Sequence, residues 1–235
     1  MPEAFRTGFY QRYNARRLEH LAGLGLELGD KTVLEVGAGV GDLTSFFLDR
    51  GCTVTSVEPR AENIQRCAET FRSAEYPPTV SLRLVHCDVE SLPQNVAERF
   101  EIVFCYGLLY HVADPAGVLR LLADRCDGVL LLETCVSQGD QEAINPVQED
   151  VALASQSFHG GACRPTRPWL FNRLRELFAH VYVPATQPAS PEFLLDWSVP
   201  PPPEQPLIRA VFVASRQKLA SPVLLDHVPS RQRRS

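Results

Sequence analysis

Long apolar runs are missing from this sequence. No segment approaches the roughly 18 consecutive apolar residues that a membrane-spanning helix needs. The N-terminal stretch also lacks the apolar region that marks a secretion signal. We therefore expect a soluble, cytoplasmic protein that does not associate with membranes.

A surplus of basic residues is also missing. The chain has 23 Lys and Arg against 28 Asp and Glu, so its formal net charge is -5 at pH 7. Proteins that bind nucleic acids in general carry a basic surface. Lysine occurs only at Lys31 and Lys218, which we attribute to a genome-composition bias. The charge balance favours a small-molecule substrate over a nucleic acid. The chain could also form a homodimer.

Closely spaced cysteine pairs are absent too. The seven cysteines are odd in number and include no C-x-x-C pair; they are Cys52, Cys67, Cys87, Cys105, Cys126, Cys135 and Cys163. Several lie in apolar runs typical of core strands, where free cysteine is common. This pattern predicts free, buried thiols in a reducing compartment rather than a disulfide framework.

What the sequence does contain is an alternation of strand and helix patterns, in a chain long enough for one large domain. The expected strands cover residues 32–36, 53–57, 80–86, 100–106, 128–132, 181–184 and 207–214. The expected helices cover residues 10–26, 42–50, 61–73, 115–125 and 168–179. Such alternation is typical of βαβ units and predicts an α/β fold with a mostly parallel sheet.

Three regions fall outside this alternation. Residues 1–30 are expected to form an N-terminal helical cap before the domain that spans 31–215. Residues 135–166 show no clear periodicity and are too long for an ordinary connection, so we expect a lid or a substrate-binding insertion there. Residues 216–235 are expected to be a frayed, flexible tail.

A glycine-rich bend follows the first expected strand, with the spacing Glu35-x-Gly37-x-Gly39-x-Gly41. Glycines let the backbone turn sharply and approach a ligand closely. Dinucleotide-binding proteins instead use G-x-G-x-x-G, where a helix N-terminus binds a pyrophosphate. Glu35 would repel a pyrophosphate but suits a cation, such as the ammonium or the sulfonium of S-adenosylmethionine.

Two further acidic residues follow the next two strands. Glu58 lies about 20 residues beyond the bend, where a carboxylate can accept hydrogen bonds from both ribose hydroxyls. Asp88 could accept a hydrogen bond from an adenine amino group, and the backbone of Val89 could contact the ring. The alternatives are solvated strand ends for Glu35 and Glu58 and a turn-forming role for Asp88.

With these motifs in this order, the sequence resembles the class I S-adenosylmethionine-dependent methyltransferases, clearly over residues 32–134. The segments that carry the resemblance are VLEVGAGVGDLT, TSVEPR, HCDVESLP and FEIVFCYGLLYHVADP. The resemblance implies S-adenosylmethionine as the cofactor. It also implies a Rossmann-like sheet of seven strands in the order 3-2-1-4-5-7-6, with the last strand antiparallel and helices on both faces.

The resemblance also implies which residues contact the cofactor. Those for the methionine moiety are Gly37, Gly39 and Gly41, and Ala38 in the same bend is a further cofactor contact. Those for the ribose and the adenine are Glu58, Pro59, Asp88 and Val89, with Tyr106 and Gly107 beneath the cofactor. Family members with such an N-terminal helix often use it as a flap, and its candidates here are Tyr10, Tyr13, Asn14 and Arg17.

Methylation of a hydroxyl requires a base near the acceptor. His111 follows the fourth strand at the carboxyl edge of the sheet and is the first candidate, since histidine titrates near neutral pH. The alternative is a structural histidine that bonds a loop carbonyl. His159, in the insertion, is a second candidate, and Glu133, at the end of the fifth strand, could orient the base or bind a substrate hydroxyl.

The substrate contacts expected from the sequence are Tyr110, Arg164 and Arg167. Solvated arginines at a helix start are an equally good interpretation of the last two. His111, Asp114 and Glu133 could converge on a metal, but no spacing specifies a metal site, so Mg²⁺ is not assigned.

The segment YGLLYH after the fourth strand lacks the (Asn/Asp/Ser)-Pro-Pro-(Tyr/Phe) motif of enzymes that methylate DNA bases. We therefore expect O-methylation of a small molecule, either sugar-like or a secondary metabolite. The alternatives are a tRNA wobble-uridine-type methyltransferase and a non-catalytic S-adenosylmethionine-binding protein. A dehydrogenase is disfavoured by the glycine spacing.

Overall fold

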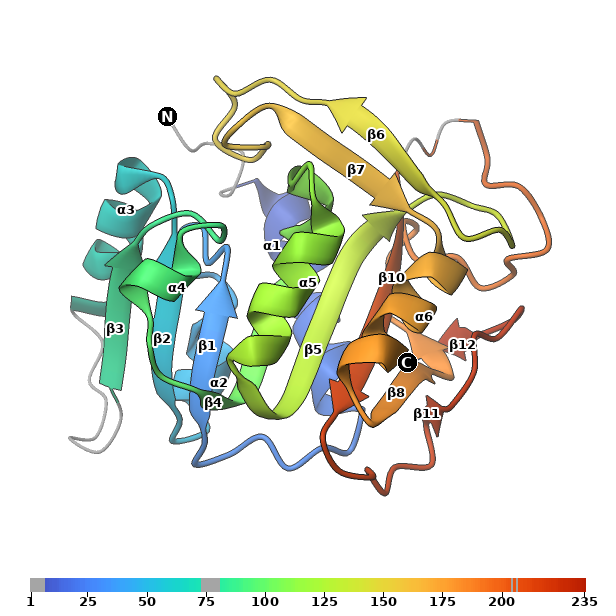
Figure 1. Cartoon of the computed structure of the whole chain (residues 1–235), viewed down its shortest axis with the longest axis horizontal. Coiled ribbons are helices and arrows are strands. Elements are labelled where there is room, and N and C mark those ends of the chain that lie inside the picture. Colours follow the sequence, from blue (N-terminus) through green and yellow to red (C-terminus); the bar gives the residue numbers. More distant parts are fainter. Residues whose placement is uncertain (1–6, 73–80, 204, 206) are drawn as a thin grey trace.

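The computed structural model describes residues 7–72, 81–203, 205 and 207–235. Its centre is a sheet of eight strands in the order β11-β8-β10-β5-β4-β1-β2-β3 (Figure 1). The strands are β1 (Thr32–Val36), β2 (Thr53–Glu58), β3 (Ser81–His86), β4 (Phe100–Tyr106), β5 (Cys126–Val136), β8 (His180–Pro184), β10 (Ile208–Ser215) and β11 (Leu224–Leu225). The core from β3 to β5 is parallel, whereas β10 runs antiparallel to both β5 and β8.

The predicted seven-strand order is confirmed, with β8 and β10 as the sixth and seventh strands and β11 as an added edge strand. The bounds of β4 agree with those expected. The fifth strand extends well beyond the expected 128–132, because β10 pairs with it from Val129 to Val136. Val80 and Ser73, the expected ends of a strand and a helix, lie outside the described residues.

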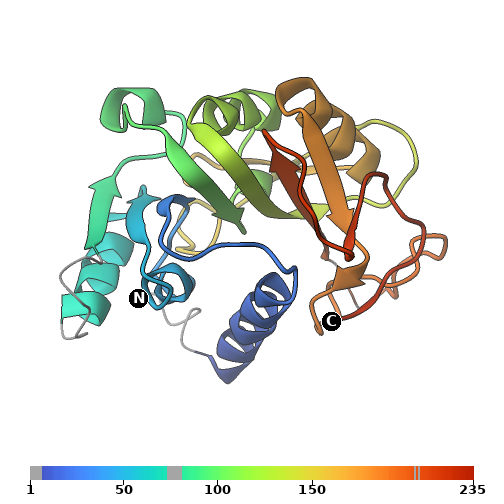
Figure 2. The same cartoon turned by 90° about the horizontal axis from the view of Figure 1, so that it is seen from below.

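Helices cover both faces of the sheet (Figure 2). On one face lie α4 (Leu92–Asn95), α5 (Pro115–Asp124) and α6 (Arg167–Leu177), and on the other lie α1 (Gly8–Ala22), α2 (Ser45–Leu48) and α3 (Ala61–Arg72). Successive side chains of a strand point to opposite faces. Accordingly, Leu34 belongs to the core beneath α5 and α6, whereas Val33 belongs to the core beneath α1 and α2. All seven cysteines are free and six are buried, as predicted.

The insertion is more regular than expected. It contains an antiparallel hairpin of β6 (Ile144–Gln148) and β7 (Gly161–Pro165), which lies beyond the carboxyl ends of the parallel strands (Figure 1). No strand is predicted for β6, because only one of its residues is half-buried and the others are exposed, so its sequence shows no alternation. The connecting loop from Glu149 to Gly160 bends back over the sheet edge.

The C-terminal segment is not the frayed tail expected from its composition. β11 pairs with the edge of β8, and β12 (Arg233–Arg234) pairs in parallel with β9 (Thr186–Gln187). The Arg234 guanidinium donates to the carbonyls of Pro188 and Phe193 at 2.8 Å each. Arginine side chains that reach buried carbonyls thus hold a polar segment against the domain. Among the residues that the structure describes, no helix is both long and apolar enough to span a membrane.

Candidate active site

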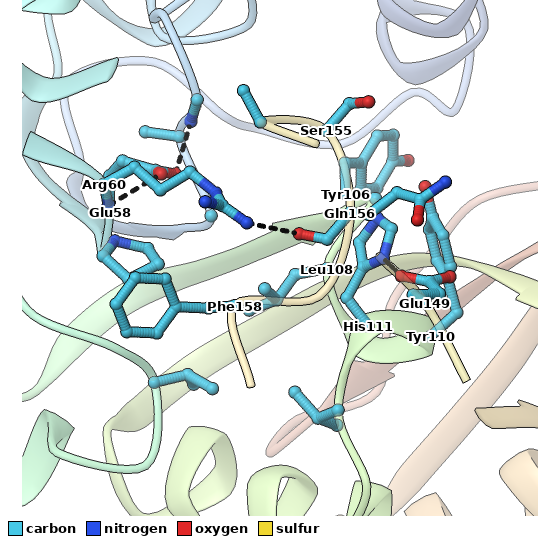
Figure 3. Close-up of a pocket in the computed structure, with 18 of the residues that line it drawn as sticks. Glu58, Arg60, Tyr106, Leu108, Tyr110, His111, Glu149, Ser155, Gln156 and Phe158 are labelled. Carbon is cyan, nitrogen blue, oxygen red and sulfur yellow. Dashed lines mark hydrogen bonds and ion pairs between the residues drawn. The ribbon is translucent and has the colours of Figure 1, made fainter. Parts of the chain in front are cut away.

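A cavity of about 600 Å³ lies at the carboxyl ends of β1, β2 and β4. Residues of α1 and of the insertion complete its lining, and Figure 3 shows the part where the insertion loop faces β2 and β4. Open α/β sheets bind ligands in the crevice at this edge, where the strand order reverses between β1 and β4. The sequence-predicted motifs therefore meet in one cavity.

Glu35, at the end of β1, lines this cavity and is almost fully buried. Its Oε2 accepts hydrogen bonds from the Thr44 hydroxyl at 2.6 Å and the Ser56 hydroxyl at 2.7 Å. Burial raises the pKa of Glu35 to about 7, although both hydroxyl bonds act in the opposite direction. A cation bound nearby would favour the charged carboxylate and so offset part of the burial cost.

Glu58, at the end of β2, faces the same cavity. Its Oε2 accepts from the backbone N–H of Gly39 at 3.0 Å, and its Oε1 accepts from Asn63 at 2.9 Å and the backbone N–H of Arg60 at 3.1 Å. Gly37 and Gly39 have positive φ angles of 74° and 57°, which let the bend pass close to this carboxylate. Ala38 and Pro59 also line the cavity.

Asp88 and Val89 line another part of the cavity, next to His159. One Asp88 oxygen accepts from the Ser91 backbone N–H at 2.7 Å, as the turn-forming interpretation expects. The other lies 3.7 Å from His159 Nε2. His159 is thus placed beside Asp88, at the end for which adenine is predicted.

His111 ends a short 3-10 helix, η2 (Leu109–His111), and its Nδ1 bonds to Glu149 Oε2. Glu149 follows β6 and also accepts from Arg164 Nη2 at 2.9 Å and from the Ser157 backbone N–H at 2.8 Å. Burial opposes ionisation of Glu149, but the bonds from His111 and Arg164 outweigh it and lower its pKa to about 2. Burial lowers the pKa of His111 against the opposing pull of Glu149. At neutral pH the pair is therefore a carboxylate and a neutral imidazole with its proton on Nδ1.

Helix α1 contributes all four of its predicted residues, Tyr10, Tyr13, Asn14 and Arg17, to the lining. Arg17 Nη2 donates to Glu133 Oε2 at 2.5 Å. Arg209, from β10, donates to Glu133 Oε1 at 3.0 Å and to the Tyr110 hydroxyl at 3.1 Å. The buried Glu133 carboxylate thus binds two arginines that line the cavity, Arg17 from α1 and Arg209 from β10.

Four polar atoms of residues that line the cavity are buried without a hydrogen-bond partner: the hydroxyls of Tyr13 and Tyr106, the Nε of Arg17 and the Oδ1 of Asn63. Buried polar groups normally have a partner. Tyr13, Tyr106 and Arg17 line the cavity together with Gly107, whose added Cβ would lie 3.3 Å from Arg17 Nη2. A ligand with a polar end, such as an amino-acid moiety, fits these unpaired groups.

Three predicted site residues do not line the cavity. Glu133 is fully buried between Arg17 and Arg209, because β5 continues to Val136 and the strand end lies farther on. Arg167 stacks on Trp197 with 3.7 Å between its Cζ and the ring centroid, and it donates to the Pro229 carbonyl at 2.9 Å. These contacts correct the expected substrate role of Arg167 and the expected role of Glu133 in orienting the base or binding a substrate hydroxyl.

Gly41 is the third. An added Cβ there would come within 2.7 Å of Cys67 Sγ and 2.8 Å of the Phe71 ring. This glycine therefore allows close packing of the bend against α3 rather than contact with a ligand.

The acidic and histidine groups considered for a metal do not converge. Asp114 caps α5 by accepting from the Gly117 N–H at 2.9 Å, Glu133 is held by arginines, and His111 is bonded to Glu149. Within the described part of the chain, no group of three or more His, Cys, Asp or Glu could hold a metal ion.

Three site residues were missed from the sequence. Glu149 bonds to His111, 38 positions away, and the Arg60 side chain bonds to the Val151 carbonyl, 91 positions away, and no local spacing signals such contacts. Arg209 lies inside a buried apolar strand, IRAVFVAS, and an arginine at such a position requires a buried partner. Arg209 could therefore have been identified from the sequence by its position in this apolar strand.

The fold is of the Rossmann-like class, with a cavity at the carboxyl edge of its parallel strands. Residues 6–185 match the family described as "Methyltransferase domain", and the chain belongs to this family.

The chain is also similar to curated enzymes named ubiquinone biosynthesis O-methyltransferase. Identity is 35% over 111 residues with the enzyme of Psychrobacter cryohalolentis, covering 46% of this chain and 42% of that one. It is 34% over 112 residues with the enzyme of Serratia proteamaculans, covering 48% and 45%. The matches thus span less than half of these relatives.

Solved structures with the same fold include the N-terminal domain of EvdMO1 with SAH bound. Its TM-score is 0.64 at 22% identity, covering 87% of this chain and 81% of that one. A second is the 1,6-didemethyltoxoflavin-N1-methyltransferase of Burkholderia thailandensis, with a TM-score of 0.56 at 20% identity and coverage of 92% and 84%.

Proposed function

We propose that this protein transfers a methyl group from S-adenosylmethionine to a hydroxyl of a small molecule. The observation that carries the proposal is the His111–Glu149 pair in the wall of a cavity that also contains Glu35 and Glu58. Membership of the methyltransferase family and similarity to enzymes named O-methyltransferases support it.

The cofactor half of the cavity suits S-adenosylmethionine. Glu58 would accept from the ribose hydroxyls, Asp88 and Val89 would contact adenine, and Glu35 would stabilise the positive end of the cofactor. The unpaired groups of Tyr13, Tyr106 and Arg17 would bind its amino-acid moiety. When bound, S-adenosylmethionine supplies a methyl group activated by a positively charged sulfur, so the remaining task of the protein is to place and deprotonate the acceptor.

His111 is the proposed general base. Because Nδ1 donates to Glu149, Nε2 is left as the acceptor for a hydroxyl proton. Glu149 would then stabilise the imidazolium that forms, in the way that a buried carboxylate supports a catalytic histidine elsewhere. A non-catalytic binding protein has no need of this pair, which favours an enzyme.

The proposed acceptor is a hydroxylated small molecule, sugar-like or a secondary metabolite. Phe158, whose side chain is exposed, offers a ring face on which a substrate ring could pack, whereas the Tyr110 ring is covered by the guanidinium groups of Arg164 and Arg209 in the same lining. His159 is a weaker candidate base, because it lies beside Asp88 and 57% of its side chain is exposed.

Calorimetric titration with S-adenosylmethionine and, separately, with NAD tests the cofactor assignment. We expect binding of the first only, and preferential binding of NAD would overturn the assignment. A transfer assay with labelled cofactor against hydroxylated metabolites and sugars, with and without Mg²⁺, then tests the acceptor class. Transfer to amines but to no hydroxyl would contradict O-methylation.

A further inference from the structure

Arg60 joins the cofactor end of the cavity to the insertion loop. It follows Glu58 and Pro59 at the end of β2, and its backbone N–H donates to Glu58 Oε1 at 3.1 Å. Its side chain extends away from Glu58 toward the loop (Figure 3). One residue thus contacts the predicted ribose carboxylate with its backbone and the loop with its guanidinium.

The guanidinium lies among backbone carbonyls of the loop. Nη2 lies 3.2–3.4 Å from four of them, those of Val151, Leu153, Gln156 and Ser157. This nitrogen carries two N–H groups, so it shares its donors among the four acceptors. Phe158 adds its ring face, with 5.5 Å between the Arg60 Cζ and the ring centroid. A single side chain therefore lies within hydrogen-bond distance of all four carbonyls, of which that of Leu153 also accepts from the Gln156 backbone N–H at 3.0 Å.

The contact between Arg60 and the loop is connected by hydrogen bonds to His111, the proposed base. Ser157 accepts from Arg60 with its carbonyl oxygen, and its backbone N–H donates to Glu149 Oε2 at 2.8 Å. The same Glu149 oxygen bonds to His111 Nδ1. Ser157 is buried, so water does not readily replace these contacts. Only one residue separates the guanidinium of Arg60 from the carboxylate that orients His111.

We propose that Arg60 is a positioning residue that fixes Glu149 against His111 through Ser157. The proposal rests on the proposed function, because it assigns Arg60 to the reaction in which His111 acts as the base. Since Arg60 also follows the predicted ribose-binding Glu58, it connects the cofactor side of the site to the side that deprotonates the acceptor. The insertion loop is in this way part of the catalytic arrangement and more than a cover.

A double-mutant cycle tests this role. Arg60→Ala is expected to lower kcat about tenfold, because a small misplacement of a catalytic pair is costly. In a Glu149→Gln background the same change should lower kcat less than about twofold, since residues that act through one another are not additive. The matched control is Arg66→Ala, which removes an exposed arginine from the neighbouring α3 that pairs only with Glu69 among the described contacts. A tenfold loss in both backgrounds, or a change in KM alone, would overturn the proposal.

A second readout does not depend on activity. The ¹⁵N chemical shifts of His111 report which ring nitrogen carries the proton. We expect the Nδ1–H form in the wild type and in Arg66→Ala, and a mixture of both forms in Arg60→Ala. An unchanged Nδ1–H form in Arg60→Ala would overturn the positioning role. Absence of methyl transfer by a wild type that shows the expected shifts would instead count against the proposed function alone.

Discussion

At the level of single residues, the His111–Glu149 pair determines how activity should depend on pH. Burial lowers the pKa of His111, and Glu149 opposes that effect. The neutral base is therefore present at pH 7, and kcat should fall as the pH decreases through the lowered pKa. His111→Ala should reduce kcat about 10²-fold or more while cofactor affinity is retained.

Glu149→Gln is the informative companion variant in this pH profile. It removes the group that raises the pKa of His111, so the acidic limb of kcat should move to lower pH and the plateau should fall. Replacement of the exposed His227 by Ala is the control and should leave the profile unchanged. A kcat that stays at the wild-type level in His111→Ala would remove His111 from the mechanism.

Glu35 gives a second prediction at this scale. Its pKa of about 7 means that the carboxyl is partly protonated at neutral pH. A positively charged cofactor would favour the carboxylate, so binding at pH 7 should release a proton. Calorimetry in buffers of different ionisation enthalpy measures this release, which should disappear in Glu35→Gln and persist in Glu90→Gln, an exposed position of the same lining. Equal release from all three proteins would contradict the assignment.

The raised pKa of Glu35 also affects stability. The folded protein holds this proton more tightly than the unfolded chain, whose carboxyl titrates near 4.5. The resulting stabilisation is full below pH 4.5 and is lost as the pH rises through about 7.

At the scale of elements, the C-terminal segment closes the edge of the sheet. Ending the chain after Lys218 would remove β11 and β12 and leave the carbonyls of Pro188 and Phe193 without Arg234. We expect a loss of several kcal/mol in the free energy of unfolding, at about 1 kcal/mol for each hydrogen bond lost. Urea unfolding measures it. Arg231→Ala, which breaks one exposed ion pair of the same segment, should change it by less than about 1 kcal/mol.

Sequence patterns predicted those elements whose burial is periodic. The parallel strands are short, apolar and buried on both faces, so β1 and β4 were found with the observed bounds. The cofactor motifs were found because Glu35 lies next to one short glycine-rich loop and Glu58 lies at one strand end, so each is recognisable from local sequence. Glu149 was not, because its role depends on a hairpin that brings it back to His111. The pairing of β12 likewise depends on long-range arginine contacts that composition does not encode.

At the scale of the whole molecule, Glu133 connects three elements. It accepts from Arg17 on α1 and from Arg209 on β10, and it lies within β5. Glu133→Gln would leave the buried Arg17 guanidinium without its counter-charge, whereas Arg209 would keep its pair with Glu192, and we expect a cost of about 3–5 kcal/mol. The free energy of unfolding in urea checks this value. Glu69→Gln, in an exposed pair with Arg66, is the control and should cost less than about 1 kcal/mol. Similar small losses in both variants would show that the cluster adds little.

The same cluster bears on how ligands reach the cavity. Helix α1 is tied to the sheet by Arg17, and His20 on the same helix bonds to the Thr186 carbonyl at 3.0 Å. Moving this helix would separate the buried Arg17–Glu133 pair, whereas moving residues 150–158 breaks mainly the bonds of Arg60 and Ser157. We therefore expect cofactor and product to pass on the insertion side, where the speed of loop opening would set an upper limit on turnover.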